Sequence, residues 1–274
     1  VATGGWPQVP DVSGREHVVT SNEIFDLPTF PQRLVVVGGG YIASEFASIF
    51  NGLGSNVTQL YRGEQILRGF DADVRQFAAD EMCKHGVGLR VSVDVRDIVK
   101  TADGLLVTLT DDSTVLADTV LYATGRSPNV SGLGLDRVGV EQRKSGAVVV
   151  HENYQSSVPS IYALGDVTDR VQLTPVALAE AMQLVDHLFG DGTRKMNYDC
   201  IPTAVFTHPN IGTVGLTEAA ARSQLGAVRV YRSNFKALKH TLSGSGERTL
   251  MKLVVDDASD RVVGLHVVGT DAGE

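Results

Sequence analysis

The sequence has few of the features that would place it in a membrane or in a disulfide scaffold. Among its 274 residues there are only two cysteines, Cys83 and Cys200, and no CxxC or CxxxxC pair. This sparse pattern predicts no disulfide framework, favours structural over reactive roles for both thiols and indicates the reducing cytoplasm. No apolar run is long enough to cross a bilayer, and the start, Val1-Ala2-Thr3, does not read as a secretory leader. We therefore expect a cytoplasmic protein that does not bind a membrane.

Basic residues are in deficit. Lys and Arg number 24 against 32 Asp and Glu, for a net charge of −8. This argues against nucleic acid as the main partner, because binding a phosphate backbone requires a basic surface. Glycine, by contrast, is abundant at 29 residues, which is typical of tight turns and of backbone that approaches a ligand closely. We expect no metal site.

Hydrophobic periodicity predicts a mixed α/β chain. Residues 33–37 form an apolar, β-branched run that ends in three glycines, which is typical of a buried parallel strand. Apolar residues then recur at helical spacing from 41 to 53, and 56–61 reads as the next strand. Together they predict a complete βαβ unit. Asp71 is expected to cap a second helix that runs to His85.

Beyond this unit the pattern predicts shorter strands and then a second, antiparallel part. Asp103-Gly104 is a hairpin signal, so we expect a parallel sheet that carries an antiparallel meander. The meander and sheet strands are expected at 89–93, 98–100, 105–109, 115–116 and 119–123. A strand at 160–164 and a helix over 174–189 should follow, and then a terminal α+β domain with strands 228–235, 250–255 and 261–268 and a helix over 217–225.

The clearest motif is a GxGxxA fingerprint, Gly38-Gly39-Gly40-Tyr41-Ile42-Ala43, directly after a predicted strand and at the start of a predicted helix. In that setting the first glycine makes the tight turn, the second lets a pyrophosphate approach the backbone, and Ala43 stands where helix and strand pack closely. Free N–H groups and the positive end of the helix dipole then hold the phosphates. A merely tight turn is the alternative, but the strand–turn–helix–strand context favours nucleotide binding.

The end of the second strand of this unit indicates which nucleotide binds. NAD sites usually have an acidic residue there, which binds the ribose 2′-hydroxyl. Here the strand ends in Tyr61-Arg62, and Arg68 follows in the same loop. Two guanidinium groups suit the 2′-phosphate of NADP, which a carboxylate would repel. The alternatives are two ordinary surface arginines, or Glu64 as a ribose contact beyond the strand end.

Tyr41 and Glu45 stand four residues apart in the predicted helix, so they share a face close to its first turn. That face is next to where a nicotinamide would lie. A glutamate at this place is equally explained as a partner of the helix dipole.

Several further motifs occur in one order along the whole chain: Ala2-Thr3-Gly4, GGGYIASE (38–45), YRGEQILRGFD (61–71), ATGRSPN (123–129), IYALGDV (161–167), LTPVA (173–177) and IPTAVFTHPNIGTVGLTE (201–218). In this set and order they resemble the glutathione reductase family, within the pyridine nucleotide–disulfide oxidoreductases. The resemblance implies a Rossmann-like NADPH-binding domain with an antiparallel meander, the remainder of an FAD-binding domain and a partial α+β dimerisation domain. The implied ranges are 1–4 (end of the FAD-binding domain), 5–128 (NADPH), 129–199 (second part of the FAD-binding domain) and 200–274 (dimerisation, incomplete).

The resemblance also implies roles for single residues on the NADPH side. Tyr41 is expected to be the lid that covers the flavin until nicotinamide displaces it, and Glu45 to lie beside the nicotinamide. Arg62 and Arg68 are expected to grip the 2′-phosphate. The remaining positions implied to line the NADPH site are Gly38, Gly39, Gly40, Ile42, Gly125, Gln172 and Ala204.

On the flavin side, Asp166 is expected to accept a hydrogen bond from the FAD ribitol, with Gly165 allowing the close approach. Thr174 matches the residue whose backbone meets the pyrimidine edge of the flavin, and Thr3 belongs to the same site. Thr174 is predicted to be the N-cap of its helix with Pro175 at the first helical position. A polar turn after a strand is the simpler reading of Gly165-Asp166.

The activity that the resemblance implies is hydride transfer from NADPH through FAD to glutathione disulfide, in redox homeostasis, by a homodimer. No residue of this chain is predicted to be catalytic, because the CxxxxC disulfide and the catalytic His-Glu pair of the family are expected before Val1 and after Glu274. His208, although followed by a proline, is expected to be structural. Met182 stands where some family members have an arginine that binds glutathione, and Glu180 lies two residues earlier.

Three alternatives stay open in this reading. Mercuric reductase has its distinguishing cysteines outside this stretch, and dihydrolipoyl dehydrogenase is disfavoured because it would need an acidic residue at Tyr61-Arg62. A truncated NADPH-binding module without catalysis is the third.

Overall fold

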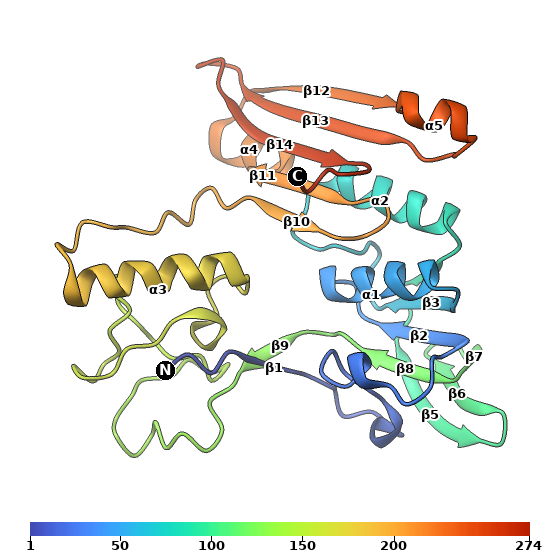
Figure 1. Ribbon diagram of the computed structural model, residues 1–274, viewed down its shortest axis with the longest axis horizontal. Coiled ribbons are helices and arrows are strands. Elements are labelled where there is room, and N and C mark those ends of the chain that lie inside the picture. Colours follow the sequence, from blue (N-terminus) through green and yellow to red (C-terminus); the bar gives the residue numbers. More distant parts are fainter. The chain divides into compact units, whose positions relative to one another are not determined.

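The computed structural model describes residues 1–274, which group into two compact units. Unit 1 contains residues 1–8 and 125–198, and unit 2 contains residues 9–124 and 199–274 (Figure 1). None of the helices combines the length and the apolar composition that crossing a bilayer requires.

The centre of unit 2 is a four-stranded parallel sheet with the order β4-β3-β2-β8. Successive residues of β2 point to opposite faces, and both faces are buried: Leu34 and Val36 belong to one hydrophobic cluster, Val35 and Val37 to another. Burial on both sides explains why this strand is an unbroken apolar run. The strands are β2 (Arg33–Val37), β3 (Asn56–Tyr61), β4 (Gly88–Val91) and β8 (Thr119–Tyr122), and the first helices are α1 (Tyr41–Gly52) and α2 (Ala72–Lys84).

An antiparallel meander packs on one of these faces. Ile98, Val107 and Leu109 share a buried cluster with Val35 and Val37. The predicted hairpin at Asp103-Gly104 is confirmed, since Thr101 pairs with Gly104 across the turn. The meander consists of β5 (Val95–Thr101), β6 (Gly104–Leu109) and β7 (Thr114–Ala117), and two 3₁₀ helices precede the sheet at η1 (Arg15–His17) and η2 (Ile24–Asp26).

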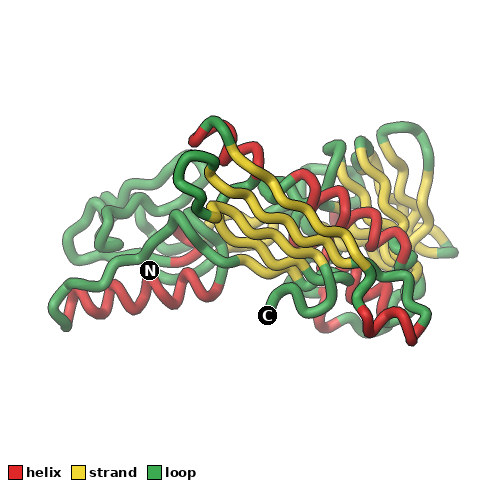
Figure 2. The backbone as a smooth tube through the Cα atoms, turned by 90° about the horizontal axis from the view of Figure 1, so that it is seen from above, coloured by secondary structure: helices red, strands yellow, loops and turns green.

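The C-terminal part of unit 2 is a five-stranded antiparallel sheet with the order β10-β11-β14-β13-β12, and its broad face is seen in Figure 2. Thr217 caps α4 by accepting a hydrogen bond from the N–H of Ala220, at 3.2 Å. The elements are β10 (Thr203–Val205), β11 (Ile211–Gly215), α4 (Glu218–Leu225), β12 (Val228–Phe235), α5 (Leu238–Ser243), β13 (Thr249–Asp256) and β14 (Val262–Val268).

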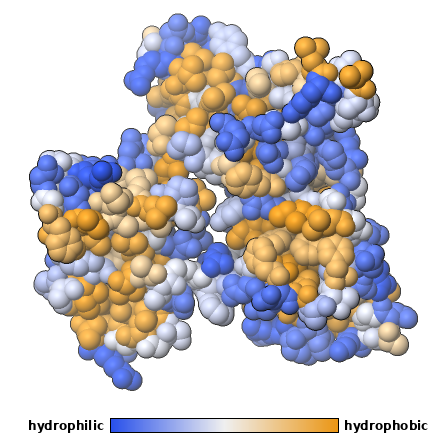
Figure 3. Space-filling model, in the orientation of Figure 1, coloured by the Kyte–Doolittle hydropathy of each residue, from blue (hydrophilic) through white to orange (hydrophobic).

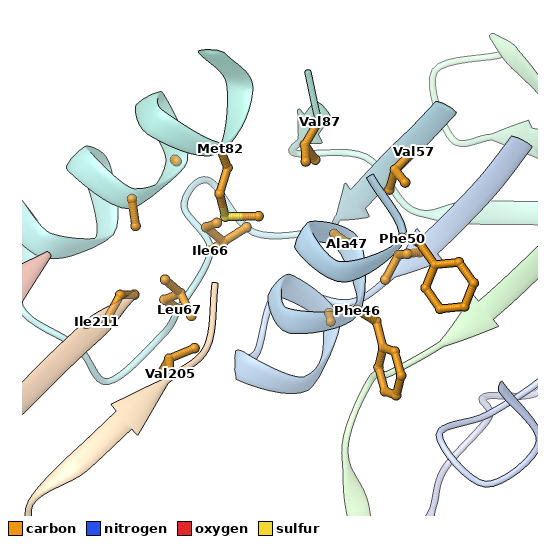
Figure 4. Close-up of a cluster of buried hydrophobic side chains, with 14 of the residues drawn as sticks. Phe46, Ala47, Phe50, Val57, Ile66, Leu67, Met82, Val87, Val205 and Ile211 are labelled. Carbon is orange, nitrogen blue, oxygen red and sulfur yellow. The ribbon is translucent and has the colours of Figure 1, made fainter. Parts of the chain in front are cut away.

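One hydrophobic cluster joins the parallel sheet of unit 2 to its five-stranded antiparallel sheet. Ile66 and Leu67, from the loop after β3, have no exposed surface. They lie between Met82 of α2 and the strand residues Val205 and Ile211 (Figure 4). This loop is therefore part of the core, although it has no regular secondary structure.

Unit 1 has little regular structure. Its elements are a short antiparallel pair, β1 (Gly5–Pro7) with β9 (Arg126–Pro128), the 3₁₀ helix η3 (Gly165–Thr168) and the helix α3 (Thr174–Phe189). The predicted helix over 174–189 is confirmed. β1 and β9 pair with each other, so both belong to unit 1, and the chain passes between the units at 8/9 and 124/125. The boundaries that the resemblance implies, at 4/5 and 128/129, each lie four residues from these crossings. The implied domain ranges stay a prediction.

Two local predictions in unit 1 are wrong. Residues 160–164 form no strand: Tyr162 makes an isolated bridge with Gln155, and the N–H groups of Ala163 and Leu164 donate to Tyr154 and Val1. Thr174 is not the N-cap. Leu173 is the last extended residue, and its carbonyl accepts the first helical hydrogen bonds, which makes Thr174 the first helical residue. In unit 2, β10, β11 and α5 had not been predicted.

Candidate nucleotide-binding site

The three glycines of the fingerprint meet different surroundings. A side chain at Gly38 would strike the carbonyl oxygen of Ala123 at 2.3 Å, and its φ of 144° suits only glycine. A side chain at Gly39 would strike the ring of Tyr61 at 2.4 Å. At Gly40 a Cβ would have no atom within 4 Å. The turn is therefore closed on the protein side and open at Gly40, the start of α1.

Helix α1 begins without a side-chain cap. Gly40 is its extended N-cap residue, with φ −85° and ψ 179°. The first N–H groups of a helix have no partner within the helix and carry the positive end of its dipole. Exposed backbone donors at an uncapped, glycine-lined helix end fit a pyrophosphate.

The loop after β3 is held against this turn. The N–H of Leu67 donates to the carbonyl of Gly39 at 2.6 Å. On the other side, the guanidinium of Arg75 binds the carbonyls of Gln65 and Ile66, at 2.5 and 2.7 Å. The loop backbone is thus fixed by the glycine turn, by α2 and by the core shown in Figure 4.

Two guanidinium groups project from this fixed loop. Arg62 and Arg68 are exposed, and neither forms an ion pair or a side-chain hydrogen bond. Arg62 directly follows Tyr61, whose ring lies on Gly39, and Arg68 directly follows Leu67. Two unpaired positive charges next to the glycine turn fit the 2′-phosphate of NADPH. Glu64, the alternative ribose contact, is also exposed and unpaired.

The loop ends at Asp71, whose carboxylate joins two helix N-termini. One oxygen accepts from the N–H of Asp73 in α2 at 3.0 Å, and the other accepts from the N–H of Glu218 in α4 at 2.9 Å. Lys252 of β13 also binds this carboxylate, at 2.7 Å. Burial would raise the pKa of Asp71, but the hydrogen bonds and the positive charge of Lys252 lower it below its ordinary value.

Glu45 connects α1 to the segment after β10. Its Oε1 accepts from the N–H of Phe206 at 2.9 Å. Burial raises the pKa of Glu45, and the bond from Phe206 only partly offsets this. Ala204 lies two residues earlier on β10 and is half-buried, as are Tyr41 and Ile42 at the start of α1. The structure therefore brings the predicted residues of unit 2 to the start of α1 and to the segments bound to it.

In unit 1 two of the predicted flavin residues, Gly165 and Asp166, form the start of η3. Glu180 of α3 is 1% exposed, and its carboxylate accepts from the N–H of Gly165 at 2.7 Å and from the hydroxyl of Tyr198 at 2.6 Å. Asp166 follows in the first turn of η3, half-buried and without an ion pair or side-chain hydrogen bond. An unpaired acceptor beside a glycine with a φ of 71° fits a polar flavin chain that approaches the backbone.

Three of the other four predicted residues of unit 1 have hydrogen-bond partners within that unit. Thr3 donates its hydroxyl to the carbonyl of Asn129 at 2.6 Å. Gln172 donates to Asp169 at 3.0 Å, and the carbonyl of Gly125 accepts from the N–H of Gln8 at 2.9 Å. Thr174 is exposed at the first turn of α3. Gly125 and Gln172 were predicted for the NADPH site, whose other members belong to unit 2.

Three buried polar residues of these regions were not predicted: Gln59 under the glycine turn, Glu180 behind Gly165, and Lys252 beside Asp71. Their sequence signal was a polar residue at an inward position of an apolar strand or helix. Among the residues singled out earlier, His208 and both cysteines are exposed, and the His208–Pro209 peptide bond is cis. Met182 is exposed on α3.

Comparison with known proteins places these regions in a family. The family model described as pyridine nucleotide-disulphide oxidoreductase matches residues 1–181, and the model of its dimerisation domain matches residues 201–274. Among curated relatives, glutathione reductase of Burkholderia cepacia is 47% identical over 274 residues, and trypanothione reductase of Trypanosoma congolense is 41% identical over 279 residues. Each comparison covers 100% of this chain, but 61% and 57% of the respective relatives.

Solved structures agree with this. The HOCl-induced flavoprotein disulfide reductase RclA from Escherichia coli has a TM-score of 0.91 and 29% sequence identity, and the match covers 98% of this chain and 63% of that one. The chain thus spans less than two thirds of the proteins that it resembles.

Proposed function

We propose that this chain, which belongs to the pyridine nucleotide-disulphide oxidoreductase family, is the NADPH-binding core of a flavoprotein that reduces glutathione disulfide. The observation that carries the proposal is the pair of unpaired arginines, Arg62 and Arg68, on a loop fixed against an open glycine turn. The choice of glutathione disulfide as substrate is supported by the identity of 47% to a glutathione reductase.

On the NADPH side, the backbone at Gly39, Gly40 and Ile42 would hold the pyrophosphate, since the space above Gly40 is open. Arg62 and Arg68 would bind the 2′-phosphate through charge-assisted hydrogen bonds. Glu45 would orient the nicotinamide from the face of α1 that it shares with Tyr41, the proposed lid. Ala204 of β10 belongs to the same proposed site, and Gly125 and Gln172 of unit 1 stay predicted NADPH contacts.

When bound, FAD supplies the relay that passes the hydride of NADPH to a disulfide. Asp166 would accept a hydrogen bond from its ribitol, and Glu180 keeps the N–H of Gly165 fixed beside it. The exposed N-terminus of α3, at Thr174, presents the positive end of the helix dipole, which favours negative charge on a bound flavin. Thr3 belongs to the same proposed site.

A homodimer is the proposed assembly. On the face of the C-terminal sheet opposite Lys252 and His266, the neighbouring side chains Tyr231, Met251 and Leu265 are exposed, as are Leu238 and Leu242 of α5. Figure 3 shows apolar side chains gathered over the part of the surface formed by this sheet. A large exposed apolar surface favours association, and a two-fold axis lets one patch bind its own copy. The cytoplasm is the proposed location.

The test uses the full-length protein that contains this chain. We expect it to oxidise NADPH when glutathione disulfide is added, to release glutathione thiol in a ratio of about two per NADPH from the stoichiometry of disulfide reduction, and to use NADH poorly. Trypanothione disulfide and mercuric ion serve as rival substrates. If only one of these rivals is reduced, that compound and not glutathione disulfide is the substrate. Binding of NADPH with no disulfide reduction would indicate a non-catalytic module.

A further inference from the structure

A buried glutamine lies under the glycine turn, in a strand that is otherwise apolar. Gln59 of β3 has no exposed surface. Its side-chain Nε2 donates to the carbonyl of Gly38 at 3.0 Å and to Oγ of Ser44 in α1 at 3.2 Å. Its Oε1 has no hydrogen-bond partner.

Burying the unpaired Oε1 of Gln59 costs free energy, which the hydrogen bond to Gly38 has to offset. A leucine at this position would bury itself without leaving a polar atom unpaired, whereas Gln59 leaves its Oε1 without a partner. Turning the amide over would place two oxygens against each other at Gly38. The unpaired end therefore indicates that the glutamine is kept for the donor it presents to the Gly38 carbonyl.

The Gly38 carbonyl controls the direction of the next N–H. A trans peptide is planar, so its carbonyl and its N–H point in opposite directions. Since Gln59 draws the carbonyl of Gly38 into the interior, the N–H of Gly39 points away from the interior, and no backbone carbonyl accepts it. Gly39 is buried, and an unpaired N–H on a buried residue is rare unless a ligand serves it.

We infer that Gln59 is a positioning residue, which fixes the peptide between Gly38 and Gly39 so that the Gly39 N–H binds a phosphate of the dinucleotide pyrophosphate. This inference rests on the proposed nucleotide-binding function. It concerns the pyrophosphate, which NADPH and NADH have in common. Arg62 and Arg68, by contrast, serve only the 2′-phosphate. The two sets of residues can therefore be separated by choice of ligand.

The test compares the wild type with Gln59→Leu on three ligands, measured as Kd by isothermal titration: NADPH, NADH and 2′-AMP, which lacks the pyrophosphate. The loss of one hydrogen bond to a charged group should weaken both dinucleotides by about 10- to 100-fold. Binding of 2′-AMP should stay within about twofold, because independent sites are nearly additive. Ser48→Ala is the matched control, since Ser48 is buried on α1, the helix that carries Ser44, and its hydroxyl has no partner. It should change none of the three.

Equal weakening of all three ligands would show that Gln59 only supports the fold, and unchanged dinucleotide binding would show that it positions nothing. Either result overturns the inference. A wild type that binds no dinucleotide would instead overturn the proposed function. If Gln59→Leu does not fold, titration of the ¹⁵N-labelled wild type with inorganic pyrophosphate decides the matter: the Gly39 amide signal should shift on binding, and an unmoved signal contradicts the inference.

Discussion

Replacing Lys252 by methionine should destabilise unit 2 strongly. The Lys252 side chain is 2% exposed, and its ammonium lies 2.7 Å from Asp71, 2.6 Å from Asp73 and 2.8 Å from Glu218. Arg232 also binds Asp73 and Glu218, at 2.5 and 2.7 Å, so these two keep a cation in the variant. Asp71, with its side chain 1% exposed, does not. Removing one partner of a buried ion pair costs about 3–5 kcal/mol.

The assay is urea unfolding followed by circular dichroism. Arg96→Ala is the control, because Arg96 pairs with Asp112 at the surface, with side chains 54% and 79% exposed, and such pairs contribute less than about 1 kcal/mol. Adding Asp71→Asn to Lys252→Met should restore part of the loss, since asparagine still caps α2 and leaves no buried charge, while its single oxygen leaves the N–H of Glu218 without an acceptor. A loss from Lys252→Met no larger than that of the control, or no recovery in the double variant, would refute the reasoning.

The sign of the pH dependence gives a second check on the same residue. In the wild type the pKa of Asp71 is lowered, so its contribution is present above the unfolded pKa of about 3.9 and is lost as pH falls through the folded value. Without Lys252, burial would raise the pKa of Asp71, and its ionisation would then destabilise the variant as pH rises. The stability gap between wild type and variant should widen between pH of about 4 and 7, and a constant gap would contradict this.

Three other substitutions test separate parts of the account. Gly38→Ala should lower the free energy of unfolding by at least about 1 kcal/mol, because the φ of Gly38 is 144° and the carbonyl of Ala123 blocks a Cβ. Gly40→Ala should keep the fold but weaken dinucleotide binding. Thermal unfolding and nucleotide titration measure the two effects, and a Gly40→Ala variant that is less stable than Gly38→Ala would contradict the turn geometry. Glu180→Gln should cost about 1–3 kcal/mol, because an amide cannot accept from both Gly165 and Tyr198 without turning a donor towards one of them; a variant with unchanged melting would contradict this. Glu45→Gln removes a carboxylate whose pKa is raised by burial. The stability of the wild type relative to this variant should therefore fall as pH rises from the unfolded pKa of about 4.3 through the folded one. Parallel stability profiles of the two proteins against pH would contradict this.

Elements with strong local signals could be predicted from the sequence. β2, α1 and β3 combine apolar periodicity with glycines at both turns, and α3 begins beside Pro175 and ends before Gly190. The segment at 160–164 misled the prediction because its backbone partners, Val1 and Tyr154, could not be read from its own pattern. Helix α5 was missed because it is short and its leucines are exposed, which removes the amphipathic signal.

The same limit holds for the site. The glycine turn and the arginine pair were predicted because each lies within one βαβ unit and each has a distinct chemistry. Lys252 was not, since its partner Asp71 is 181 residues away in the sequence. Gln59 was missed because the pattern of a strand does not indicate which buried carbonyl needs a hydrogen-bond donor. Glu180 was missed because its partners, Gly165 and Tyr198, lie outside α3, one before it and one after it in the sequence.

The most direct test of the central claim is the affinity of the chain for NADPH and for NADH, with and without Arg62 and Arg68. At about 1.5–3 kcal/mol for each charge-assisted hydrogen bond, the wild type should bind NADPH about a hundredfold or more tightly than NADH. The variant with both Arg62→Ala and Arg68→Ala should bind the two alike, while Arg96→Ala keeps the preference. Equal affinities in the wild type, or a preference that survives the loss of both arginines, would contradict the account.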